Sequence, residues 1–127
     1  MEYGFSKDVA LSYEDTLDKV TEELKKEGFG VLTEIDVKDT LKNKIDVDFK
    51  KYKILGACNP TLAHKALQAE ENIGLMLPCN VVVYEKDDKS VLSIFAPTLM
   101  KNVISNESIN SIADEVNVKL HRVFDNV

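Results

Sequence analysis

Glycine, proline, cysteine and aromatic residues are all scarce in this chain of 127 residues. It contains 5 glycines, 3 prolines, 2 cysteines and no tryptophan, while 44% of its residues are hydrophobic. This combination excludes collagen-like and disordered chains, which are rich in Gly or Pro or poor in apolar residues. A chain of this length has room for one hydrophobic core but hardly for two. We therefore expect a single domain over residues 1–127.

Long hydrophobic stretches and an excess of positive charge are also missing. The longest apolar run, residues 73–84, is interrupted by Pro78, Cys79 and Asn80, and it is shorter than the ~20 residues of a membrane-spanning helix. The first residues lack the basic end and apolar stretch of a secretory signal. The net charge is -6, whereas proteins that grip nucleic acid normally carry the opposite bias. We expect a cytoplasmic protein with neither membrane nor nucleic-acid partners.

Capping residues predict where the helices begin. Ser12 and Asp36 each precede apolar residues at helical spacing, so a long and a short helix should follow them. Asn59-Pro60 is a further start signal, because Asn caps free N–H groups and Pro fits the first helical turn. Ser105 or Asn106 should cap a long final helix.

Runs of β-branched residues predict the strands. Residues 79–84 form the strongest run, and residues 90–95 follow it after a charged turn, so the two should pair as a hairpin. Further strands are expected near residues 2–6, 31–35 and 49–55. This order predicts an α+β fold in which an antiparallel sheet is covered on one face by two long helices. The exposed face or edge of such a sheet favours a homodimer.

Two short stretches carry the unusual chemistry, and each joins a cysteine to an asparagine. They are residues 56–60, followed by His64, and residues 77–80. Cys58 is expected at a helix N-terminus, where the positive helix end should lower its pKa. His64 lies about one and a half turns into the same helix. It is interpreted either as a base or ligand that acts with Cys58, or as a side chain exposed to water.

The two cysteines allow three interpretations. Cys58 and Cys79 are buried packing residues, a redox or thiol-transfer pair, or a metal site completed by His64 and a fourth ligand. No CxxC spacing is present to indicate a preformed metal site. Asn59 is explained by helix capping, and Asn80 by a structural hydrogen bond that holds the loop around Cys58, or by ligand binding. Phosphate loops, nucleophile elbows and HExxH pairs are absent, so no catalytic residue or cofactor is assigned.

Several of these stretches together resemble a known family. They are YKILGACNP at residues 52–60, AHKAL at 63–67, GLMLPCNVVVY at 74–84, and Ala96-Pro97 with Met100. The chain resembles the bacterial and archaeal family called domain of unknown function 302 over nearly its whole length. The resemblance implies a small α+β domain with a TATA-binding-protein-like topology, assembled as a homodimer, and it implies neither DNA binding nor an activity. It directs attention to Cys58, Asn59, Pro60, Cys79 and Asn80, with His64 beside them.

Two functional hypotheses follow from these residues. The first is a homodimeric small-ligand-binding or accessory protein with a site near Cys58 and Cys79. The alternative is a thiol-dependent redox enzyme or metal-binding protein that uses Cys58, Cys79 and His64. The sequence does not identify the ligand, and it does not show whether the two thiols lie close together.

Overall fold

The computed structural model describes residues 2–127, which form helices around one five-stranded antiparallel sheet. The strand order is β1-β5-β4-β3-β2, so β1 and β2 are the two edges. The strands are β1 (Gly4–Val9), β2 (Gly30–Asp36), β3 (Tyr52–Cys58), β4 (Cys79–Lys86) and β5 (Lys89–Phe95). The hairpin expected after residues 79–84 is confirmed as β4 and β5.

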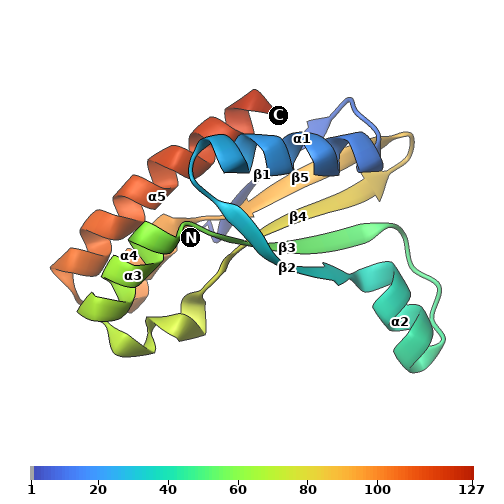
Figure 1. The fold of residues 1–127 in the computed structure, drawn as a ribbon. Coiled ribbons are helices and arrows are strands. Elements are labelled where there is room, and N and C mark those ends of the chain that lie inside the picture. Colours follow the sequence, from blue (N-terminus) through green and yellow to red (C-terminus); the bar gives the residue numbers. More distant parts are fainter. Residues whose placement is uncertain (1) are drawn as a thin grey trace.

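Helices occupy the connections and the C-terminal end of the chain. They are α1 (Tyr13–Lys26), α2 (Val37–Ile45), α3 (Pro60–Ala69), the 3₁₀ helices η1 (Glu71–Met76) and η2 (Pro97–Leu99), α4 (Met100–Val103) and α5 (Glu107–Asn126). The long helices α1 and α5 lie on the same face of the sheet (Figure 1), which confirms the predicted α+β layout. The TATA-binding-protein-like topology fits this arrangement and stays a prediction. None of the helices within residues 2–127 is long and apolar enough to cross a membrane.

The helix starts follow the capping signals. The Ser12 hydroxyl accepts the N–H of Asp15 at 3.1 Å, and the Asp36 carboxylate accepts the N–H of Asp39 at 3.0 Å. Asn106, rather than Ser105, caps α5. The 3₁₀ helix η1 was not predicted, because its apolar residues read as a lead into the following strand.

Alternation along β4 separates the two faces of the sheet. Val81 and Val83 are 0% exposed and belong to the core beneath the helices. The intervening Val82 is only partly buried and lies on the opposite face, which we call the outer face. One row of cross-strand partners crosses this outer face from edge to edge: Ile35, Ile54, Val82, Ser93 and Ser6. Its β2–β4 half is therefore apolar and its β5–β1 half polar.

A buried polar contact fixes α1 against the sheet. The hydroxyls of Thr16 and Ser90 are 2.6 Å apart, and the Ser90 hydroxyl also lies 3.1 Å from the carbonyl of Leu11. Thr16 and Ser90 are both 0% exposed. Because a buried hydroxyl without a partner is costly, this pair favours one position of α1 along β5.

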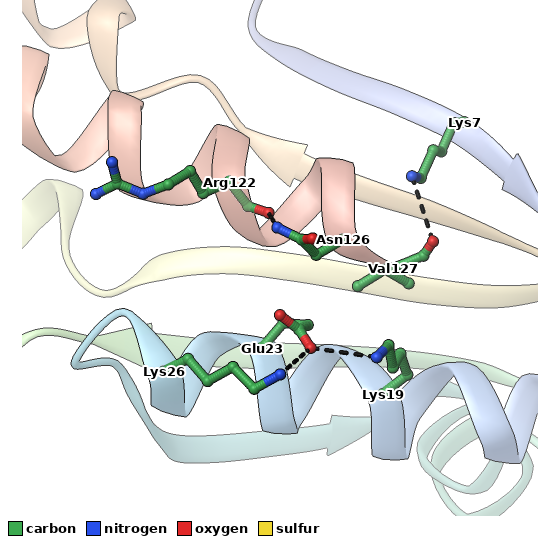
Figure 2. Close-up of polar contacts among 7 residues, drawn as sticks. All are labelled: Lys7, Lys19, Glu23, Lys26, Arg122, Asn126 and Val127. Atoms are coloured by element: carbon green, nitrogen blue, oxygen red, sulfur yellow. Dashed lines mark hydrogen bonds and ion pairs between the residues drawn. The ribbon is translucent and has the colours of Figure 1, made fainter.

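Polar contacts within α1, within α5 and between β1 and the C-terminal residue are drawn in Figure 2. Lys7 on β1 donates to the carbonyl of Val127 at 3.4 Å, so the C-terminal end of α5 is tied to the edge strand. On α1, the Glu23 carboxylate lies 2.8 Å from Lys26 and 3.2 Å from Lys19. At the C-terminal end of α5, the side-chain amide of Asn126 donates to the carbonyl of Arg122 at 2.7 Å, within the last turn of the helix.

Candidate functional site

The two cysteines lie at one end of the sheet because β3 and β4 run antiparallel. Cys58 is the last residue of β3 and Cys79 is the first residue of β4. Ala57 stands directly opposite Cys79, and Cys58 stands opposite Gly30 on the other side of β3. The fold thus brings together two residues that are 21 positions apart in the sequence.

Both cysteines line the same cavity, whose volume is about 40 Å³. Cys79 is 6% exposed, and Cys58 is partly exposed. The surrounding side chains come from the ends of β3 and β4, from α3 and α5, and from the connections: Phe29, Ala57, Asn59, Leu62, Ala63, Ala66, Ile73, Leu77, Pro78, Pro97, Met100, Ile109, Ile112, Ala113 and Val116. The cavity is thus lined by apolar side chains, by Asn59 and by three residues that contain sulfur: Cys58, Cys79 and Met100.

Burial is the main cause of the raised pKa of both thiols. It raises the pKa of Cys79 to about 11, and the nearby Cys58 adds to the increase because two negative sulfurs repel. Burial also raises the pKa of Cys58. The lowered pKa expected for Cys58 is therefore wrong, although α3 does begin at Pro60. Removal of the thiolate from water disfavours the charged form, so raised pKa values keep both thiols protonated at neutral pH.

Asn59 performs the predicted capping role and a second one. Its side-chain oxygen accepts the N–H of Leu62 at 3.2 Å. Its amide nitrogen donates to the carbonyl of Glu27 at 3.4 Å. Asn59 therefore joins the start of α3 to the end of α1, next to Cys58, and this position accounts for it without a ligand.

The absence of a side chain at Gly56 allows the segment that precedes Cys79 to pack closely against β3. A Cβ atom at this position would clash with the Thr33 hydroxyl and would lie 2.8 Å from Cγ of Pro78. Pro78 immediately precedes Cys79 and follows a cis peptide bond with Leu77. The glycine of the GACNP stretch thus allows β2 and the start of β4 to approach β3 closely.

His64 and Asn80 do not join the cysteines. His64 is exposed on α3 and does not line the cavity. No group of three or more His, Cys, Asp or Glu side chains within residues 2–127 is arranged to hold a metal, so the structure does not form the metal site of Cys58, Cys79 and His64 that was one of the three interpretations. Asn80 is exposed opposite Gly56 on the outer face. Its side chain makes no hydrogen bond within the described part of the chain, so the expected bond to the Cys58 loop is also wrong.

No signal in the sequence identified the side chains of α5 that form one wall of the cavity. Ile109, Ala113 and Val116 of α5 form that wall, and their spacing of three and four residues predicted only a packing face. Met100 belonged to the stretches that carry the family resemblance, but nothing in the sequence related it to Cys58 and Cys79. The structure places all three sulfur-bearing residues around one cavity.

Comparison with protein families matches the model for domain of unknown function DUF302 to residues 5–127. The chain belongs to this family. Among solved structures, it is similar to an uncharacterized conserved DUF302 protein from Bacillus stearothermophilus, with a TM-score of 0.90 and 29% sequence identity over 99% of this chain and 98% of that one. No match is found among the curated proteins. Membership of the DUF302 family thus supports the fold and names no ligand or reaction.

Proposed function

We propose that this DUF302 protein is a homodimeric binding or accessory protein of the cytoplasm whose cavity takes a ligand of only a few atoms. The observation that carries this proposal is the cavity that Cys58 and Cys79 share between β3, β4, α3 and α5. A volume of about 40 Å³ accommodates roughly three water-sized groups. Typical pockets for larger organic ligands hold roughly 300–1,000 Å³, so size favours an ion or a very small molecule.

The thiol-enzyme alternative has less support from the geometry. A thiol nucleophile requires a lowered pKa or an adjacent base. The pKa of both Cys58 and Cys79 is raised by burial, and His64 does not line the cavity. These observations favour binding over nucleophilic catalysis.

Access of a small molecule to Cys79 tests the binding function. The reduced Cys58→Ser variant is treated at pH 8.5 with methyl methanethiosulfonate, which is small, and separately with a bulky maleimide. We expect the small reagent to modify Cys79 in the folded protein and the maleimide to react only after unfolding. If Cys79 resists both reagents until the protein unfolds, the cavity admits no ligand and the proposal fails.

The homodimer is proposed to form through the apolar half of the outer face. Ile35 is 48% exposed there, beside the partly buried Ile54 and Val82. The rings of Tyr52 and Tyr84 stack at 5.3 Å on the same face and extend the apolar area. A second copy of this surface would remove these side chains from water.

Oligomeric state tests this interface. Light scattering after size-exclusion chromatography should give a dimer for the wild type and a monomer for Ile35→Lys. Val118 on α5 is 53% exposed and supplies the control, because Val118→Lys should remain dimeric. A monomeric wild type, or an Ile35→Lys protein that stays dimeric, argues against an interface at this face.

A further inference from the structure

Three sulfur-bearing side chains line the cavity, and they come from three different segments. Cys58 ends β3, Cys79 begins β4, and Met100 begins α4. Cys79 and Met100 are each 6% exposed. All three line the same cavity, and none of its other lining residues is a carboxylate or a histidine.

This set of side chains discriminates between metal ions. Thiolates and thioethers are soft ligands that select soft ions such as Cu(I), whereas Mg²⁺ and Ca²⁺ prefer oxygen. Structural zinc sites use four ligands from Cys, His and carboxylates, and iron–sulfur clusters are held by four such residues. The cavity offers two thiols and one thioether, which suit an ion with two or three sulfur ligands.

We infer that the cavity is a binding site for one Cu(I) ion, with Cys58 and Cys79 as its thiolate ligands and Met100 as a neutral third ligand. This inference rests on the proposed function and names the ligand class of the same cavity. A single ion fits a volume of about 40 Å³, and most of the side chains that line the cavity are apolar.

Binding is balanced in protons and electrons. Two S–H bonds break, one at Cys58 and one at Cys79, and two copper–sulfur bonds replace them. Both protons leave to solvent, and the copper remains monovalent, so no oxidant or reductant takes part. Met100 contributes a lone pair and loses no proton. The bound group carries one negative charge, which the N-terminal end of α3, immediately after Cys58, favours.

Competition for Cu(I) tests the inference. Reduced full-length protein is titrated without oxygen against the chromophoric chelator bicinchoninate. We expect one Cu(I) per chain in the wild type, and a loss of affinity of roughly 100-fold or more in Cys58→Ser and in Cys79→Ser, since each removes a primary ligand. Met100→Leu should weaken binding by about tenfold. Met76→Leu is the matched control, because Met76 lies outside this cavity, and its affinity should equal that of the wild type.

A second measurement keeps the test independent of variant stability. X-ray absorption of the Cu(I)-loaded wild type should show sulfur neighbours only, and zinc offered under the same conditions should not bind stoichiometrically. Copper affinity equal in the wild type and the Cys58→Ser/Cys79→Ser protein would overturn the inference, as would nitrogen or oxygen neighbours. If methyl methanethiosulfonate reaches Cys79 but Cu(I) does not bind, only the ligand identity is wrong. If Cys79 is inaccessible as well, the proposed function itself fails.

Discussion

Ala57 and Cys79 are direct cross-strand partners, and this single register position brings both cysteines to one rim of the sheet. Cys58 follows Ala57 at the point where β3 turns into α3, so its side chain reaches the same cavity as Cys79. A shift of one residue between the strands would move Cys79 to the outer face, since side chains alternate along a strand. The site therefore depends on the pairing of β3 with β4.

The titration of Cys79 should show this proximity. In the wild type its pKa is raised to about 11, first by burial and second by the charge of Cys58. Cys58→Ser removes the second contribution, so the pKa of Cys79 should fall while remaining above that of a free thiol. The pH dependence of methyl methanethiosulfonate labelling, resolved by peptide mass spectrometry, measures both values. An unchanged pKa in Cys58→Ser would show that the thiols do not interact.

Gly56→Ala should destabilise the protein by about 1–3 kcal/mol, because the added Cβ meets Thr33 and Pro78 in packed surroundings. Gly74→Ala is the matched control, since a Cβ at Gly74 has no atom within 4 Å. Its effect should stay within about 1 kcal/mol. Denaturant unfolding followed by circular dichroism compares the two. Equal stability of the two variants would refute the close approach at Gly56.

Thr16→Val should cost about 1 kcal/mol of unfolding free energy, because it removes the buried hydroxyl contact with Ser90. Ser90 keeps its contact with the Leu11 carbonyl, so no buried hydroxyl is left without a partner. Thr21→Val on the exposed side of the same helix is the control and should change stability by less than about 0.5 kcal/mol. Chemical denaturation provides the comparison. A Thr16→Val protein as stable as the wild type would count against the role given to this contact.

Glu23→Gln should lower the melting temperature at neutral pH but not in acid. The hydrogen bond from Lys26, supported by Lys19, holds the pKa of Glu23 below its usual value. A lowered pKa in the folded state stabilises the protein above the unfolded pKa, and this contribution disappears as the pH falls through the folded value. Melting temperatures of the two proteins should therefore differ at pH 7 and converge in acid.

The control for this pH dependence is Glu115→Gln. Glu115 is exposed on α5 and forms no ion pair within residues 2–127. Its melting temperature should follow the wild type at every pH. A constant difference between Glu23→Gln and the wild type down to pH 2 would mean that the charge of Glu23 is not the cause.

Local signals in the sequence were sufficient to predict the strands and the capped helices, but not the 3₁₀ helix η1. The caps at Ser12, Asp36 and Asn59 act through backbone groups within three residues, so they can be recognised without tertiary contacts. The β4–β5 hairpin was predictable for the same reason. In contrast, η1 has no cap and depends on the packing of Ile73, which is 1% exposed in the second core cluster.

The site was predictable only in part, because it depends on contacts between distant segments. Cys58 and Cys79 were identified from their sequence motifs, but only the strand register shows that they share a cavity. His64 appeared to be a member because it is close to Cys58 in sequence, yet its place on α3 points it to solvent. The pKa of Cys58 was predicted in the wrong direction, since the extent of its burial is set by surrounding elements that a single motif does not reveal.

The location of a bound soft metal ion shows whether Cys58 and Cys79 share a single site. Crystals of the reduced protein are soaked with Ag(I), whose preference for sulfur matches that of Cu(I), and anomalous scattering locates the silver. We expect one silver ion per chain inside the cavity, bonded to the sulfurs of both Cys58 and Cys79. Silver bound at Cys58 alone, with Cys79 turned away from it, would contradict a shared site.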